Sequence, residues 1–176
     1  MYPHNTEMDL WIGYALYFAA RGRGLCAEVG ASEAPYTSPA RVLLSGLGAD
    51  ELFGGYARHT MAFQKQGYLG LANELKLDIG RVGKRNLGRD DRIMSHFGKE
   101  VRYPYLDDRL VRWAVETPAW EKCDFANGND VFGIEAVKRV LRLVALELGM
   151  EGAAKEKKRA VGLNFHSPLE ALPSHH

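Results

Sequence analysis

A short segment of glycines and carboxylates follows three consecutive apolar residues in the first third of the chain. Residues 42–44 read VLL, and residues 45–51 read SGLGADE. The apolar run predicts a short, buried parallel strand, and the glycines predict a turn into a helix that begins near Ala49. A strand, a glycine turn and a helix start together direct backbone N–H groups at an anion. Gly46 and Gly48 would let that ligand approach the backbone closely.

The spacing excludes two familiar phosphate-binding motifs. Glu51 occupies the position of the last glycine in the dinucleotide fingerprint, and the segment lacks the lysine of a P-loop. Asp50 would repel a bare phosphate, but it suits a phosphate that arrives with Mg²⁺. We therefore predict a metal–nucleotide site at the carboxyl end of the strand, where open α/β sheets bind ligands. In the alternative interpretation, the two carboxylates only complement the helix dipole.

The segment before this turn is predicted to contain a helix and a loop. Asn5 and Thr6 are good N-caps, apolar residues then recur at helical spacing, and Gly22 ends the pattern. Residues 27–40 contain two prolines and indicate a loop. The predicted site therefore lies between this loop and the helix that begins near Ala49.

Helical patterns also dominate the rest of the chain. The helix near Ala49 is broken by the glycines at 54–55, and the chain after Met150 is basic and then irregular. Asp130 caps the strongest pattern, whose polar face carries Lys138 and Arg142. The helical patterns cover residues 69–97, with glycine interruptions, and residues 107–115 and 131–148.

This pattern predicts the α/β fold class, rich in helix, with one or few parallel strands. A buried strand needs neighbours at both edges, because an open edge exposes unpaired backbone groups. Two arrangements would supply them. Either another chain pairs with this one, or the segment belongs to a larger α/β domain whose other strands lie upstream, which is the arrangement we favour.

Composition and charge exclude several classes of protein. The 176 residues are 46% hydrophobic and 26% charged, as in an ordinary globular domain. The net charge of +1 gives no reason to expect binding to nucleic acid or to a membrane surface. Cys26 and Cys123 form no CxxC pair and are too few for a disulfide framework, which favours a reducing, cytoplasmic setting. The histidines are not spaced as metal ligands.

Two longer motifs resemble those of one enzyme family. The sequence SGLGADELFGGY (45–56) resembles a motif of asparagine synthetases that begins Ser-Gly-Glu-Gly. The sequence RNLGRDDRIMSHFGKEVRYPYLDDRLV (85–111) resembles the second signature of the same family. The resemblance extends over about residues 3–160 and implies a partial asparagine synthetase domain at 1–160, followed by an irregular tail at 161–176.

The resemblance implies the C-terminal portion of an ATP-pyrophosphatase domain (adenine nucleotide alpha hydrolase-like) and a role in glutamine-hydrolysing asparagine synthesis. In that family ATP activates aspartate as β-aspartyl-adenylate, pyrophosphate leaves, and ammonia from a glutaminase domain attacks. The implied cofactors are ATP and Mg²⁺. The implied partners are an aspartate-like small-molecule substrate and an upstream glutaminase domain or partner chain. Matching positions put Ser45, Gly46, Leu47 and Gly48 at the nucleotide, Asp50 at Mg²⁺, and Glu100 and Lys158 in catalysis.

The charged residues of these motifs also have a structural interpretation. Arg102 and the charges of the second signature are predicted to form an ion network rather than a catalytic group. Lys157 and Lys158 are either phosphate ligands or part of a solvated basic run. The network is predicted to join Arg89, Asp90, Asp91, Arg92 and Glu100.

The chain departs from the family pattern in three places. Leu47 stands where the family has a glutamate, and a leucine cannot move a proton. The pyrophosphate-binding sequence Ser-Gly-Gly-x-Asp-Ser is absent, and Gln-Phe-Gly-Ser does not follow the basic run. Three hypotheses result: part of an amide ligase that is inactive on its own, a non-catalytic nucleotide- or protein-binding descendant of the fold, or a truncated product.

Overall fold

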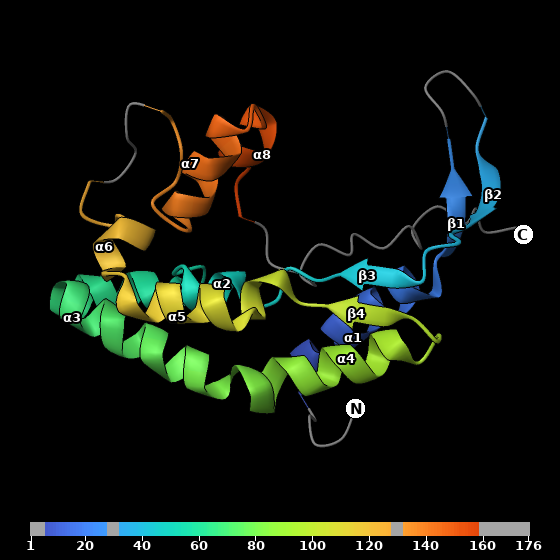
Figure 1. Ribbon diagram of the computed structural model, residues 1–176, viewed down its shortest axis with the longest axis horizontal. Coiled ribbons are helices and arrows are strands. Elements are labelled where there is room, and N and C mark those ends of the chain that lie inside the picture. The colour runs from blue at the N-terminus through green and yellow to red at the C-terminus, as the bar shows by residue number, and fades with distance from the viewer. Residues whose placement is uncertain (1–5, 28–31, 128–131, 159–176) are drawn as a thin grey trace, which may run out of the picture.

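The computed structural model describes residues 6–27, 32–127 and 132–158 (Figure 1). Within them it is a helix-rich α/β structure with two separate two-stranded sheets. The helices are α1 (Glu7–Arg21), α2 (Ala49–Leu52), α3 (Ala57–Val82), α4 (Gly88–Ser95), α5 (Asp108–Glu116), α6 (Ala119–Lys122), α7 (Arg139–Glu147) and α8 (Glu151–Lys155). The strands are β1 (Arg23–Cys26), β2 (Ala34–Thr37), β3 (Val42–Leu44) and β4 (Glu100–Arg102).

The first helix forms as predicted. Thr6 is the N-cap of α1 and its hydroxyl accepts a hydrogen bond from the Asp9 N–H at 3.1 Å. Gly22 ends the helix in the left-handed region, with φ +67°, which glycine adopts without strain. The other predicted cap, Asn5, lies outside the described residues. Helix α1 packs against α4, and Arg89 of α4 forms an ion pair with Asp9 at 2.5 Å.

The loop prediction for residues 27–40 is wrong in part. Ala34–Thr37 form β2, which pairs antiparallel with β1. Pro35 is tolerated because a two-stranded ribbon has only edge strands. Every residue of both strands is exposed, so no burial pattern marked them as strands in the sequence.

Strand β3 forms where it was predicted and is parallel, but it is not buried. It pairs with β4, which the sequence did not reveal, and the register places Val42 opposite Glu100. The side chain of Leu44 is 75% exposed and that of Val42 is 42% exposed. The exposure arises because the described sheet has one pair of strands, whereas parallel strands are ordinarily covered on both faces.

A long helical arm runs along the bottom of Figure 1 and joins the two halves of the molecule. It consists of α3, a π-helical segment (Gly83–Leu87) and α4, which follow one another without a loop. The prediction of helix over 69–97 was right in type, but α3 begins at Ala57 and its kink lies at Gly67, where φ is +60°. Gly80 does not interrupt the helix, because a helical glycine costs only about 1 kcal/mol relative to alanine.

The C-terminal helices are shorter than predicted. Asp130 and Val131 lie outside the described residues, and the helix expected over 131–148 is formed only at Arg139–Glu147. Arg142 was expected on the polar face but is buried. It donates hydrogen bonds to the carbonyl oxygens of Ala154 (2.6 Å) and Glu156 (2.8 Å). The chain reverses at Gly149, so α8 folds back onto α7 and covers this guanidinium.

Two apolar clusters hold the helices together. In the first, Leu71 and Leu75 of α3 pack on Ala119 and Cys123 beside α6. In the second, Leu52, Phe53 and Ala114 join α2 to α5 and to the apolar face of α7. Across the described ranges, no helix has the length and apolar character needed to cross a membrane.

Candidate functional site

The glycine turn after β3 is fixed by contacts at both of its ends. The Ser45 N–H donates to the Arg102 carbonyl at 2.9 Å and so continues the parallel ladder beyond Leu44. At the other end Gly48 has φ +101°, and a Cβ there would lie 2.6 Å from Cδ2 of Leu106. Only glycine fits this position, both because of its backbone conformation and because of the close packing.

Asp50 lies at the centre of a cluster of charges that the turn positions. Helix α2 is a single turn, and it places the Asp50 carboxylate where two lysines from distant segments meet it. Oδ1 lies 2.9 Å from the Lys138 ammonium, and Oδ2 lies 3.3 Å from the Lys158 ammonium. Lys158 also donates to the Gly55 carbonyl oxygen. One carboxylate with two ammonium groups leaves a net positive charge, which is the requirement for binding an anion.

Lys138 was not predicted as a site residue. The sequence placed it on the solvated face of a helix, whereas it is the N-cap of α7 and adopts a left-handed conformation, with φ +54°. Among the described residues it is the one non-glycine residue with positive φ. A cation at a helix N-terminus is opposed by the helix dipole. The sequence could not show this unusual placement of Lys138, because it predicted that the helix begins at residue 131 and not after Lys138.

The two lysines also determine the acidity of Asp50. Burial alone would raise the pKa of this carboxyl, but the Lys138 ammonium, and then the Lys158 ammonium, lower the pKa below its usual value. Asp50 therefore contributes stability that is fully present above its unfolded pKa, about 3.9. That contribution is lost as the pH falls through the lower, folded pKa.

Replacement of Asp50 by asparagine tests whether the ionised carboxylate, held by the two lysines, stabilises the fold. At pH 7 the variant should have a lower free energy of unfolding than the unchanged protein, and the difference should narrow as the pH falls below about 4. Urea unfolding followed by circular dichroism at several pH values measures it. Glu100→Gln is the control, because its exposed pair with Arg102 should contribute at most about 1 kcal/mol. If Asp50→Asn lowers the free energy of unfolding by the same amount at pH 7 and at pH 3, the lowered pKa of Asp50 is contradicted.

Glu51 serves a different role from its neighbour. It is buried, and its Oε1 accepts hydrogen bonds from the Tyr56 hydroxyl at 2.6 Å and from Asn86 Nδ2 at 2.8 Å. Burial, and then the hydrogen bond to Glu51, raise the pKa of Tyr56 above its usual value, so this phenol stays protonated. The Lys158 ammonium lies 4.7 Å from the centroid of the Tyr56 ring, within the range of a cation–π contact. Glu51 thus anchors the ring against which Lys158 lies.

A buried histidine beside the site is structural. Nδ1 of His59 accepts a hydrogen bond from the Tyr56 N–H at 3.2 Å, so the ring proton is on Nε2, which lies 2.9 Å from Oδ2 of Asp78. Burial lowers the pKa of His59 although Asp78 opposes the shift. Both ring nitrogens are engaged, and Arg58 also donates to Asp78. The hydrogen bonds among Arg58, His59 and Asp78 fix the start of α3, and neither ring nitrogen of His59 is left free to act as a base.

The structure brings together most, but not all, of the sequence-predicted site residues. Ser45 lies on the turn and Asp50 lies on α2. The Lys158 ammonium lies next to the Asp50 carboxylate. Glu100 lies at the opposite end of the strand pair, because it is opposite Val42 at the amino end of β3. It is exposed and forms a pair with Arg102 at 2.7 Å. Of the predicted ion network, the pair of Arg89 with Asp90 is confirmed, and Asp9 of α1 joins it.

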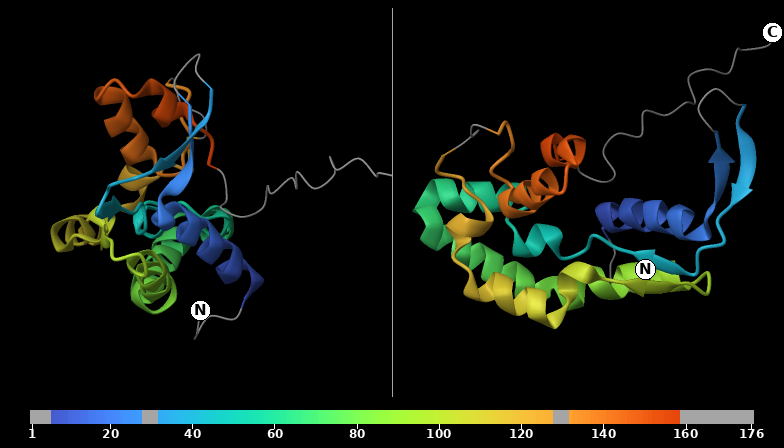
Figure 2. Two further views of the ribbon diagram at one scale, coloured as in Figure 1. Left: turned by 90° about the vertical axis from the view of Figure 1, so that its right-hand side faces the viewer. Right: turned by 45° about the horizontal axis from the view of Figure 1, so that its top comes forward.

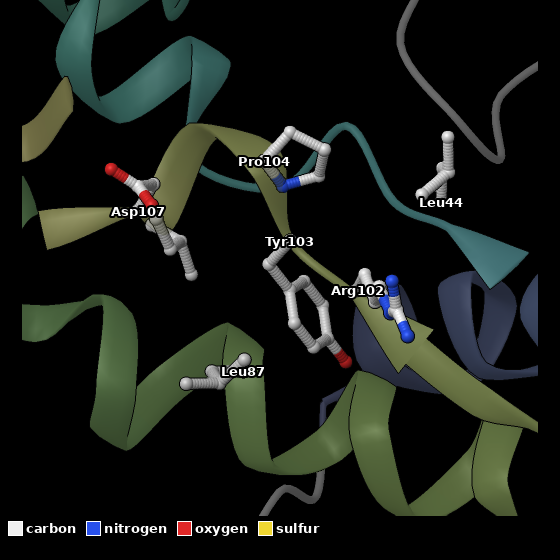
Figure 3. A pocket seen from close by; sticks show the side chains of 7 residues that line it. Leu44, Leu87, Arg102, Tyr103, Pro104 and Asp107 are labelled. Atoms are coloured by element: carbon white, nitrogen blue, oxygen red, sulfur yellow. The ribbon is translucent and has the colours of Figure 1, made fainter. Parts of the chain in front are cut away.

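An open pocket of about 530 Å³ lies where β3 and β4 end, and Leu44, Leu87 and Tyr103 are among the residues that line it (Figure 3). Figure 3 shows the Tyr103 ring pointing from the end of β4 towards the helix that carries Leu87. The Tyr103 hydroxyl is buried and, within the described part of the chain, has no hydrogen-bond partner. Burial, and then Asp91 and Asp90, raise the pKa of Tyr103 to about 12. None of the predicted site residues lines this pocket.

The residues present fit a phosphate-bound Mg²⁺ but not a free one. In the described ranges no group of three or more acidic, histidine or cysteine side chains could hold a metal. Asp50 Oδ1 is buried without an aligned hydrogen bond, although Lys138 is in ion-pair contact with it. Both Asp50 oxygens lie next to an ammonium group, so a Mg²⁺ ion would have to take the place of one lysine at the carboxylate. Phosphate oxygens would have to complete the Mg²⁺ shell, as is common for this ion, and the phosphate charge would pair with the two lysines.

Comparison with known proteins relates this chain to a family. The sequence profile of asparagine synthase matches residues 31–70 and 63–173. The chain is 44% identical over 174 residues to asparagine synthetase domain-containing protein 1 of Gallus gallus, covering 99% of this chain and 26% of the relative. It is 42% identical over 160 residues to the Homo sapiens protein of that name, covering 90% and 24%.

A more distant relative shares half of the chain. A putative glutamine-hydrolysing asparagine synthetase of Methanocaldococcus jannaschii is 44% identical over 88 residues, which is 50% of this chain and 16% of that protein. The chain spans about a quarter of the length of the Gallus gallus and Homo sapiens relatives. No solved structure matches the chain. With a profile that covers most of its residues and relatives over nearly its whole length, the chain belongs to the asparagine synthase family.

Proposed function

We propose that the chain supplies the phosphate-binding part of an ATP-dependent amide ligase site in a domain of the ATP-pyrophosphatase type. The observation that carries the proposal is the Asp50 carboxylate held between the ammonium groups of Lys138 and Lys158, next to the carboxyl end of β3. This is the edge at which parallel sheets bind nucleotides. The cluster combines one acceptor for a metal with two cations for phosphate oxygens.

The reaction that such a site would serve is the activation of a carboxylate. An oxygen of an aspartate-like substrate attacks the α-phosphorus of ATP, the bond from that phosphorus to the bridging oxygen breaks, and its electron pair leaves with pyrophosphate. Ammonia from a glutaminase domain or partner chain then displaces AMP and forms the amide. Lys138 and Lys158 would stabilise the charge that develops on the leaving pyrophosphate, and Mg²⁺ bound with the phosphates would polarise them.

Leu47 favours a second candidate function. Its side chain has no group that could accept or donate a proton, and it lies in the turn between Ser45 and Asp50, where the family motif has a glutamate. The second candidate is a module that binds a nucleotide or polyphosphate, or a protein, without catalysis. A nucleotide- or polyphosphate-binding module would use the Asp50–Lys138–Lys158 cluster as the ligase does and would differ from it in turnover, whereas a protein-binding module would not need to bind phosphate there.

Two measurements on the 176-residue protein test the proposal. Isothermal titration should detect binding of pyrophosphate in the presence of Mg²⁺, and much weaker binding of Mg²⁺ alone. A coupled assay should detect no pyrophosphate release from ATP and aspartate, because the sequence lacks the Ser-Gly-Gly-x-Asp-Ser loop. Absence of pyrophosphate binding would overturn the phosphate site. Turnover by the isolated chain would overturn the inference that this chain alone is inactive.

A further inference from the structure

Arg142 is a buried arginine on α7 whose hydrogen bonds go to the two segments that carry the lysines of the Asp50 cluster. Its side chain is only 8% exposed. A buried guanidinium requires partners for its N–H groups. Arg142 finds them in the segment before Lys138 and in the segment before Lys158. Both are within reach because α7 and α8, coloured orange to red in Figure 2, fold against each other.

On one side, Arg142 holds the backbone directly before Lys138. Its Nε donates to the Val137 carbonyl at 3.0 Å, and its Nη2 donates to Oε2 of Glu135 at 2.7 Å. The Lys138 N–H donates in turn to the Phe53 carbonyl at 3.0 Å. Lys138 has φ +54°, a conformation that a non-glycine residue keeps only where the surrounding contacts fix it. Arg142 supplies part of those contacts.

On the other side, Arg142 holds the backbone shortly before Lys158. Its Nη1 donates to the carbonyl oxygens of Ala154 at 2.6 Å and of Glu156 at 2.8 Å. The same Glu135 oxygen that accepts from Arg142 also accepts from the Lys158 N–H at 3.5 Å. Lys158 follows the end of α8. These hydrogen bonds, and not a helix, therefore fix the backbone that leads to it.

We propose that Arg142 is the positioning residue of the Asp50 cluster: by joining the segments before Lys138 and Lys158 to one guanidinium, it holds both ammonium groups at the carboxylate. Its part in anion binding rests on the proposed phosphate site. Arg142 acts through the two lysines and not on the anion itself. Lysine cannot replace it, because three donors on one nitrogen cannot span carbonyl groups of two segments.

Labelling of amines in the 176-residue protein tests the positioning without any ligand. Acetylation by sulfosuccinimidyl acetate, followed for each lysine by mass spectrometry, measures how freely its amine reacts. In Arg142→Lys the rates at Lys158 and Lys138 should rise by at least about 10-fold, the factor for one lost hydrogen bond to a charged group. Lys65, which is exposed on α3, is the internal reference. Unchanged rates at both lysines would overturn the proposal.

Two further variants separate positioning from a general loss of stability. Met94→Ala removes a buried side chain on α4, which packs against α1. It should lower the melting temperature and leave the rates at Lys158 and Lys138 unchanged, and an equal rise in this variant would overturn the proposal. If Arg142→Lys does not fold, Glu135→Ala replaces it, since the Glu135 side chain is 36% exposed. That variant should raise the rate at Lys158, and an unchanged rate would count against the proposal.

Titration with pyrophosphate and Mg²⁺ separates this inference from the phosphate site on which it rests. Arg142→Lys should bind about 10-fold more weakly, and the loss should be smaller in a Lys158→Gln background, because coupled residues are not additive. If labelling rises but the unchanged protein binds no pyrophosphate, the positioning stands and the phosphate site is wrong. If the unchanged protein binds pyrophosphate and Arg142→Lys binds it as tightly, the phosphate site stands and the positioning is wrong.

Discussion

Replacement of Gly55 by alanine should lower the free energy of unfolding by about 3 kcal/mol, at the upper end of the range for an overpacked site. A Cβ at this position would lie 1.8 Å from Oδ1 of Asp50 and 2.6 Å from its Cα. The second contact is with backbone, so a side-chain rotation cannot relieve it. The Gly55 N–H also donates to the Asp50 carbonyl at 2.8 Å, which holds the two residues together.

The matched control is Gly80→Ala. Gly80 lies inside α3, and a Cβ there would meet no atom within 4 Å. Alanine should stabilise this helix by up to about 1 kcal/mol. Urea unfolding measures both variants, and an unchanged m-value confirms that the denatured state is the same. If the two substitutions have the same effect on stability, the steric role of Gly55 is excluded.

Replacement of Lys158 by glutamine should weaken the binding of pyrophosphate with Mg²⁺ by about 10- to 100-fold. A hydrogen bond to a charged group contributes about 1.5–3 kcal/mol, and each 1.4 kcal/mol is a factor of about ten in affinity. Lys138→Gln should have a similar effect, because its ammonium lies 2.9 Å from Asp50 and that of Lys158 lies 3.3 Å from it. Isothermal titration at fixed ionic strength measures both.

Two further variants make this test specific. Lys155→Gln removes the same charge from an exposed pair with Glu151 and should leave the affinity unchanged. Asp50→Asn removes the negative charge between the lysines, so it should strengthen binding of pyrophosphate without Mg²⁺ and weaken binding with Mg²⁺. If Lys158→Gln binds pyrophosphate as tightly as the unchanged protein, the anion site lies elsewhere.

The elements that were predicted correctly are those with local signals. The Thr6 cap and the glycine at position 22 bracket α1 within a few residues of the chain. The glycines after β3 gave the turn and the start of α2 at Ala49. Family motifs brought Asp50 and Lys158 into one hypothesis before their contact was known. Each of these predictions depended on residues that are neighbours in sequence or on a resemblance to a family motif.

The features that were missed depend on contacts between distant segments. Strand β4 is three residues long and is defined by its pairing with β3, not by its composition. Arg142 was predicted to be solvated, because the sequence does not show that α8 folds over it. Lys138 was predicted to lie on the polar face of a helix, because the sequence does not show that the helix begins after it. The role of Glu100 remains a prediction, since its placement at the amino end of the strand pair does not bring it to the cluster.

The cluster around Asp50 also constrains when the site can exist during protein synthesis. Lys158 reaches Gly55 across 103 positions of sequence, so this contact is highly non-local and should form late. A nascent chain still on the ribosome can build α1, β3 and α3, yet the proposed anion site cannot form until Lys158 has left the exit tunnel. If the site binds phosphate, retention on immobilised pyrophosphate would therefore select folded chains that include Lys158 over shorter translation products.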